Sequence, residues 1–214
     1  FFMSFLLSVV LVPLVIKFCY RKGFLDLPSE RKIHSRAIPR LGGLAIFVSF
    51  VATVVYALIS NSGYSVSFEQ RMAGFLIAST LLVLLGAWDD IRGTKPYFKF
   101  LVQILIALIV FKSGTKVEVF SNPFGNGEIG LSLYVSLLFT VIWVVGIMNA
   151  INMIDGLDGL ACGVVFIAGA SLLGVCVYLN SSEPVMLLCI LCGSVSGFLF
   201  FIFPIKKIEW MIPF

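Results

Sequence analysis

The sequence contains little charge. Asp, Glu, Lys and Arg make up 12% of its 214 residues, whereas 60% are hydrophobic. Soluble domains typically carry about 25% charged residues. This shortage excludes an ordinary soluble domain and predicts an all-α polytopic membrane protein. The chain also lacks an internal repeat, a Pro-rich linker and a low-complexity tract. We therefore expect residues 1–214 to form a single integral membrane domain.

A disulfide framework and a cleaved leader are not expected either. The five cysteines lie inside apolar runs without neighbouring metal-ligand residues, so we interpret them as small buried side chains. The first apolar run lacks a small-residue cleavage site and leads into a charged loop, which indicates a retained span. The net charge of +4 does not indicate a nucleic-acid partner, because the basic residues follow a membrane pattern.

Seven apolar stretches approach the roughly 20 residues that a helix needs to cross the hydrocarbon core. They lie at about 2–20, 42–60, 71–88, 97–112, 131–149, 160–180 and 185–203. Between the fourth and the fifth, residues 113–130 are rich in Gly and Asn, which predicts turns and a short hairpin on the membrane surface.

Positive charge predicts the orientation of these spans, since basic residues are concentrated in cytoplasmic loops. The loops around 21–40, 89–96, 150–159 and 204–209 alternate onto one side, and with their flanks they hold 12 of the 15 basic residues. The same alternation places all five aspartates on that side. We therefore predict a multi-pass protein of the cell (inner, cytoplasmic) membrane whose polar segments share the cytoplasmic face.

One polar segment contains adjacent carboxylates, Asp89 and Asp90, directly after an apolar run. Charged groups beside a membrane are costly, so clustered carboxylates indicate a functional site. Mg2+ favours one or two carboxylates together with substrate phosphate oxygens and water, and the pair suits this ion. The alternative is a solvated loop in which Arg92 and Lys95 balance the two acids.

A second polar segment has the pattern Asn149-x-x-Asn152-x-x-Asp155-Gly-x-Asp158-Gly159. Spacing of three places neighbours on adjoining faces of a helix, and Asp158 is a candidate N-cap for the following span. The helix N-terminus there would favour an anionic group. A capped hairpin is the alternative, but it would not need the two asparagines inside an apolar run.

The third polar segment, residues 31–43, is basic and contains the single histidine. Arg36 and Arg40 are candidates to hold a diphosphate or a lipid phosphate. The Pro-Arg-Leu-Gly-Gly stretch at 39–43 predicts a rigid turn that enters a close-packed helix. The positive-inside pattern alone is the alternative explanation for the basic residues.

The order and spacing of these segments resemble a known family, the polyprenyl-phosphate N-acetylhexosamine-1-phosphate transferases (glycosyltransferase family 4). The matching motifs are Arg31-Lys-Ile-His-Ser-Arg-Ala-Ile-Pro-Arg-Leu-Gly-Gly, Asp89-Asp-Ile-Arg-Gly with Lys99-x-x-x-Gln103, and the Asn/Asp motif ending in Gly-Leu. The resemblance covers about residues 20–204. Within the first motif, Ile-Pro-Arg-Leu is more similar to the N-acetylglucosamine branch than to the MurNAc-pentapeptide branch, where Thr-Pro-Thr-Met is usual.

The resemblance implies an Mg2+-dependent enzyme, with Mn2+ as an alternative ion. It would transfer N-acetylhexosamine-1-phosphate, with GlcNAc-1-phosphate the expected group, from a UDP-sugar to polyprenyl (undecaprenyl) phosphate and release UMP. The expected partners are these two substrates and the lipid bilayer, and a homodimer is one oligomeric alternative. This reaction would be the first membrane step of a cell-envelope glycan such as lipopolysaccharide or teichoic acid.

Residue roles also follow from the resemblance. The catalytic residues would be Asp89, Asp90, Asp155 and Asp158, and the first three would hold the metal ion. The residues that bind substrate would be Asn149, Asn152, Arg36, Arg40 and Lys99.

The end of the chain departs from the family pattern. The family continues after the seventh span with a Gly-Asp-x-Gly-Ser stretch whose Asp is a metal ligand, whereas residues 209–214 here read Glu-Trp-Met-Ile-Pro-Phe. Together with the start at Phe1, this predicts that the sequence is part of a longer protein with ten or eleven spans. The alternatives are an inactive member that lacks this ligand, or one that uses Glu209 in its place.

Two other functions are compatible with a polar cleft in a membrane protein. The first is a transporter or lipid-binding protein, but transporters place charged residues near the midplane, and here the aspartates lie at span ends on one face. The second is a CDP-alcohol phosphatidyltransferase. That class needs an Arg shortly after its Asp-Gly pair and further aspartates, and no aspartate follows Asp158.

Overall fold

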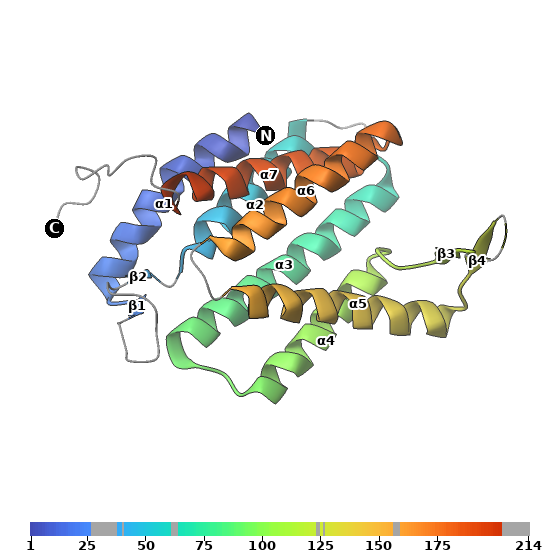
Figure 1. Ribbon diagram of the computed structural model, residues 1–214, viewed down its shortest axis with the longest axis horizontal. Coiled ribbons are helices and arrows are strands. Elements are labelled where there is room, and N and C mark those ends of the chain that lie inside the picture. Colours follow the sequence, from blue (N-terminus) through green and yellow to red (C-terminus); the bar gives the residue numbers. More distant parts are fainter. Residues whose placement is uncertain are drawn as a thin grey trace. The chain divides into compact units, whose positions relative to one another are not determined.

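The computed structural model describes residues 1–26, 38–39, 41–60, 64–122, 125, 127–155 and 159–202. Seven α-helices make up most of this part of the chain, and four short strands form two antiparallel two-stranded sheets (Figure 1). The chain divides into two compact units, one of Phe1–Ser60 with Ile154–Phe214 and the other of Asn61–Met153. The predicted all-α class is confirmed.

The first unit is built from four helices and one small sheet. Its elements are α1 (Phe2–Lys22), β1 (Leu25–Asp26), β2 (Ile38–Pro39), α2 (Gly43–Ser60), α6 (Leu160–Tyr178) and α7 (Ser182–Ile202). α7 packs against α1, α2 and α6, and α1 also packs against α2. β1 pairs with β2 where the chain leaves α1 and approaches α2.

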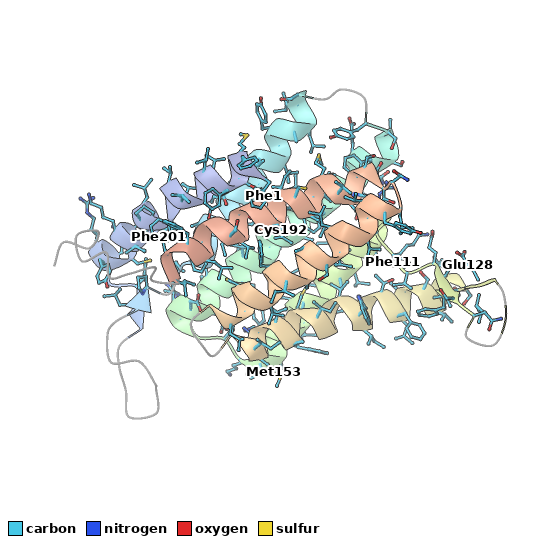
Figure 2. The ribbon with its side chains drawn as sticks, turned by 45° about the horizontal axis from the view of Figure 1, so that its top comes forward. Phe1, Phe111, Glu128, Met153, Cys192 and Phe201 are labelled. Carbon is cyan, nitrogen blue, oxygen red and sulfur yellow. The ribbon has the colours of Figure 1, made fainter. Side chains whose placement is uncertain are left out.

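Small residues let α1 and α7 approach closely. Gly193 and Gly197 lie one helical turn apart on α7 and face Ser4 and Ser8 on α1. A Cβ on Gly193 would collide with Ser4 Oγ, and one on Gly197 would lie 2.7 Å from Ser8 Cβ. Such stripes are typical of helix contacts in membranes, because large apolar side chains gain nothing by leaving lipid for another helix. Cys192, labelled in Figure 2, marks this part of α7.

The turn into α2 lies close to α7. A Cβ on Gly42 would lie 3.0 Å from the Phe198 ring, whereas one on Gly43 would meet nothing within 4 Å. Of the two glycines, only Gly42 is in close contact, and α2 itself packs against α1 and α7 as the predicted close-packed helix. The phosphate-binding candidates Arg36 and Arg40 lie outside the described residues.

The second unit is built from three helices and the other sheet. Its elements are α3 (Val66–Arg92), α4 (Pro96–Lys112), β3 (Val119–Ser121), β4 (Glu128–Gly130) and α5 (Leu133–Ile154). α3 packs against α4, and a Cβ on Gly74 of α3 would overlap the Ser113 side chain just after α4. β3 and β4 confirm the hairpin predicted between residues 113 and 130, and its place at the membrane surface stays a prediction.

Hydroxyl groups attach the first part of α5 to the segment that precedes β3. The Val117 N–H donates to Thr140 Oγ1 at 3.0 Å, and the Ser136 hydroxyl donates to the Val117 carbonyl at 2.6 Å. Phe120 on β3 packs edge-on against Phe139 on α5, with ring centroids 5.0 Å apart. The hairpin is therefore held to α5 by both polar and aromatic contacts.

Six helices of the described chain are long and apolar enough to cross a membrane, namely all except α4. α4 has 17 residues, which at 1.5 Å per residue span about 26 Å, slightly less than the hydrocarbon core of about 30 Å. α3 starts earlier than predicted and continues through both aspartates to Arg92, and α5 continues to Ile154. The chain is a multi-pass membrane protein.

Substituting Gly197→Val should destabilise the protein by about 1–3 kcal/mol, the usual cost of overpacking a tight contact, because the new side chain would meet α1. Gly174→Val in α6 is the matched control, since a Cβ there meets nothing within 4 Å. Thermal unfolding in detergent would measure both variants. Equal melting temperatures for the two would contradict the close α1–α7 contact.

Candidate functional site

A tight turn joins α3 to α4 and brings the first polar residues together. Gly93 has φ 71°, a conformation that L-residues with a side chain rarely adopt, and its N–H donates to the Asp89 carbonyl at 2.8 Å. Pro96 occupies the first turn of α4, where its fixed φ suits a helix start and its missing N–H costs nothing. These two residues explain why α3 ends and α4 begins within a few residues.

The carboxylate of Asp89 is held from both sides of this turn. Thr94 donates its backbone N–H, at 2.9 Å, and its hydroxyl to Oδ1. Lys99 on the first turn of α4 donates its ammonium to Oδ2 at 2.9 Å. The Asp89 and Lys99 side chains are 28% and 22% exposed, so the pair is half-buried and less screened by solvent than a surface ion pair.

Two asparagines on α5 continue this network. The Lys99 ammonium also donates to Asn152 Oδ1 at 3.2 Å. One turn further into the helix, Asn149 Nδ2 donates to Gln103 Oε1 at 2.8 Å and to the Val145 carbonyl at 2.9 Å. Because α5 continues to Ile154, both asparagines are helical and are neighbours on the helix, as the spacing of three predicted. Met153, labelled in Figure 2, marks this end of α5.

The cluster of Thr94, Asp89, Lys99 and Asn152 combines groups that suit a phosphate-bearing ligand. An ammonium group attracts phosphate oxygens, and an amide can donate or accept hydrogen bonds. Asp90 lies beside this cluster in the last turn of α3 and is exposed. The arrangement therefore presents acidic, basic and neutral polar groups where α3 ends, α4 begins and α5 approaches its end.

The metal-binding prediction concerns Asp89, Asp90 and Asp155. Within the residues that the structure describes, no group of three or more His, Cys, Asp or Glu side chains could hold an ion. A carboxylate has about four lone-pair positions, and Asp89 uses three of them for Thr94 and Lys99. Asp89 and Asp90 carry the oxygen ligands that Mg2+ prefers, and a metal site at this pair stays a prediction.

The remaining predicted residues belong to the first unit or lie outside the described ranges. Asp155 is exposed, directly follows α5 and belongs to the first unit, whereas Asp158 lies outside the described residues. The predicted N-cap at Asp158 is wrong, because Gly159 caps α6 with φ 75°. A Cβ on Gly159 would lie 2.8 Å from Ile202 Cγ2, so close approach as well as backbone conformation favours glycine there.

Sequence reasoning assigned no role to Thr94 or Gln103. Gln103 stands in the Lys99-x-x-x-Gln103 motif, and a spacing of four places both residues on one face of α4. That spacing could have indicated that Gln103 belongs to the same polar network as Lys99. For Thr94 the sequence offered a weaker signal, namely that a hydroxyl residue directly follows the glycine that ends a helix.

Cation–π pairs accompany the turn between α3 and α4. The Arg92 guanidinium lies 4.7 Å from the centroid of the Trp88 ring, and the Lys95 ammonium lies 5.9 Å from that of Tyr97. Aromatic and basic residues of this kind are enriched where a helix meets the membrane–water interface. The polar cluster therefore lies at a helix end that has the composition of an interface.

Fold and site together define a multi-pass helical membrane protein with a polar cluster at the ends of its helices. The model of the family described as "Glycosyl transferase family 4" matches residues 72–208. The chain belongs to this family, and the resemblance inferred from its motifs is confirmed. The matched segment includes the whole Asp89–Asn152 cluster.

Several curated relatives are similar over most of the chain. A probable undecaprenyl-phosphate N-acetylglucosaminyl 1-phosphate transferase of Bacillus subtilis is 36% identical over 209 residues, 97% of this chain and 56% of the relative. A decaprenyl-phosphate N-acetylglucosaminephosphotransferase of Mycolicibacterium smegmatis is 32% identical over 84% of this chain and 47% of the relative. A phospho-N-acetylmuramoyl-pentapeptide-transferase of Limosilactobacillus reuteri is 32% identical over 91% and 63%. The chain spans about half the length of the first two relatives.

Replacing Thr94→Val should lower the free energy of unfolding by about 1–2 kcal/mol, because it removes a hydroxyl that donates to the half-buried Asp89 carboxylate. Thr94→Ser keeps the hydroxyl and is the control. Chemical or thermal unfolding of the detergent-solubilised protein would compare the two. Equal destabilisation by Thr94→Ser and Thr94→Val would refute the role of the Thr94 hydroxyl in holding the Asp89 carboxylate.

Proposed function

We propose that the complete protein transfers GlcNAc-1-phosphate from UDP-GlcNAc to polyprenyl phosphate, with undecaprenyl phosphate the expected acceptor. A phosphate oxygen of the lipid attacks the β-phosphorus of the UDP-sugar, the bond to the α-phosphate oxygen breaks, and UMP leaves. Family membership and the functions for which the relatives from Bacillus subtilis and Mycolicibacterium smegmatis are named support this reaction.

The observation that carries the proposal is the Asp89–Lys99–Asn152 cluster. Phosphoryl transfer depends chiefly on positioning and on neutralising the charge of the phosphates. Lys99 has the charge for that task, and its ammonium is fixed between Asp89 and Asn152 at 2.9 and 3.2 Å. In this proposal Lys99 binds a substrate phosphate while Asn152 orients it.

Asp89 and Asp90 would hold Mg2+ together with substrate oxygens, and Asp155 is the further candidate. The ion would supply charge neutralisation at the phosphates, and Mn2+ is the alternative. Thr94 keeps the Asp89 carboxylate in one orientation, and the adjacent Asp90 is the more exposed of the pair. Asn149, Asp158, Arg36 and Arg40 complete the proposed substrate site.

The proposed site faces the cytoplasm from the inner membrane. The basic residues gather in the loops of one side, and the Trp88–Arg92 and Lys95–Tyr97 pairs support an interfacial position for the turn between α3 and α4. A UDP-sugar would reach this face from the cytoplasm, while the acceptor would remain in the bilayer.

The complete protein, given UDP-GlcNAc, undecaprenyl phosphate and Mg2+, should release UMP. Asp90→Asn and Asp155→Asn should each lower the rate by about 100-fold or more, because each removes charge from the reacting site. Glu128→Gln, on the exposed β4 strand, is the control and should leave the rate unchanged. UMP would be quantified by coupled assay or chromatography, and unchanged rates in both aspartate variants would refute the site.

A cysteine at Lys95, in a background with the native cysteines replaced by alanine, should react with an impermeant maleimide only from the cytoplasmic side. A cysteine at Glu128 in the β3–β4 hairpin should react only from the opposite side, because the proposed topology has α4 cross the membrane between the two positions although it is shorter than the other helices. Both side chains are exposed. Labelling intact cells and inverted vesicles would measure this, and external labelling at Lys95 would overturn the orientation.

A further inference from the structure

A hydrogen-bonded pair of amides, one buried and one half-buried, lies one helical turn inside the proposed site. Gln103 on α4 is 2% exposed, and its Oε1 accepts a hydrogen bond of 2.8 Å from Asn149 on α5. In the part of α4 that the structure describes, Gln103 is the only buried polar residue, and its buried companions are Ile106 and Ala107. A glutamine among apolar residues needs an explanation, since burying a primary amide is unfavourable unless it is hydrogen-bonded.

The pair connects two helices that are otherwise weakly joined. Among the helices described, the closely packed pairs are α1 with α7, α6 with α7, α1 with α2, α3 with α4, and α2 with α7. The pair of α4 with α5 is not among them. Two side-chain hydrogen bonds do join these helices, from Asn149 to Gln103 and from Lys99 to Asn152.

Spacing links this buried pair to the site above it. Lys99 and Gln103 are four residues apart on α4, and Asn149 and Asn152 are three apart on α5, so each set lies on one helix face. The contacts form two rungs, the outer one from Lys99 to Asn152 at 3.2 Å and the inner one from Asn149 to Gln103 at 2.8 Å. A rotation of α5 that breaks the inner rung also displaces Asn152 from Lys99.

The inner rung is better suited than the outer one to fix the axial position and rotation of α5 against α4. Asn152 is exposed and its bond to Lys99 competes with water, whereas Gln103 is buried and its bond is shorter. In a low-dielectric interior a hydrogen bond is stronger, and breaking it leaves an unsatisfied polar group. The Val145 carbonyl accepts a second bond from Asn149, which fixes the rotamer of Asn149.

We propose that Gln103 and Asn149 are positioning residues, a hydrogen-bonded pair that sets α5 against α4 so that the Lys99 ammonium lies between Asp89 and Asn152. The inference rests on the proposed function and revises it at one residue. Asn149 acts through Gln103 and not by touching substrate. Gln103, which sequence reasoning left without a role, becomes necessary for the geometry of the site.

Activity of the complete protein tests this assignment through Gln103→Leu, Asn149→Leu and the double variant. Each single substitution should lower kcat by roughly 10- to 100-fold, as expected for a misplaced reacting group, with a smaller change in KM. The double variant should be no slower than the slower single variant, because the two residues act as one unit. If the fold-loss in kcat of the double variant equals the product of the two single losses, the proposal is overturned and Asn149 contacts substrate independently.

Two further variants separate positioning from general stability. The exchange Gln103→Asn with Asn149→Gln keeps the combined length of the pair and should recover most of the activity lost by the leucine variants. Ser136→Ala removes the bond from α5 to the Val117 carbonyl, far along α5 from the site, and should lower the melting temperature without changing kcat. If the leucine variants lower the melting temperature but leave kcat unchanged, the proposal is overturned.

Cross-linking provides a measurement that does not depend on activity. Cysteines replacing Lys99 and Asn152, with the native cysteines changed to alanine, should be joined rapidly by a short bis-methanethiosulfonate reagent. Adding Gln103→Leu should slow this reaction several-fold, whereas adding Ser136→Ala should not. An unchanged rate would overturn the register claim. If the unsubstituted complete protein never releases UMP while Gln103→Leu still slows cross-linking, the proposed function is refuted and the positioning role stays supported.

Discussion

A carboxylate at the end of a membrane-spanning helix is stable only where donors or water satisfy it, and Asp89 depends on the segments that it joins. Its Oδ1 accepts from Thr94 in the turn, and its Oδ2 accepts from Lys99 on α4. Separating α3 from α4 at this end would leave a half-buried charge without its donors, which is costly near lipid. The positive φ of Gly93 and the helix start at Pro96 make the turn short enough for these bonds. The position of Lys99, and through it the contact with α5, follows from this interaction.

The two units hold their helices together by different means. In the first unit, Gly193 and Gly197 on α7 lie against Ser4 and Ser8 on α1, so the backbones approach closely and any added side chain would collide. In the second, α5 is attached by hydrogen bonds, from Ser136 and Thr140 near its start and from its asparagines near its end. Membrane helices use both devices, since burial of apolar surface alone does not favour association in lipid. Because α5 is attached by polar side chains, the asparagines near its end are also available to a ligand.

The helices, and some of the contacts among the predicted site residues, could be predicted for identifiable reasons. Runs of apolar residues mark spans directly, because every span must be long and apolar. The described residues contain seven helices where seven spans were expected, and six of them are long and apolar enough to cross a membrane. The Asn149–Asn152 spacing predicted that the two residues are neighbours on a helix, and Asp89 was expected at a helix end. The bond from Lys99 to Asn152 joins residues 53 positions apart, so no local pattern could reveal it. The N-cap of α6 was misjudged because an aspartate before glycine suits a cap, yet close contact with Ile202 and a positive φ select Gly159.

Exposure increases along the polar network, from Gln103, which is buried, through Asn149 and Lys99, which are half-buried, to Asn152 and Asp90, which are exposed. Electrostatic interactions weaken as water becomes available, so the inner contacts hold their geometry most firmly while the outer groups can exchange partners. A phosphate entering from solvent would meet Asn152 and Lys99 before it could reach Asn149. For Lys99 to bind that phosphate without leaving Asp89, its ammonium must use a third donor, and it has three. The network can therefore accept an anionic ligand at its outer end while its inner end stays unchanged.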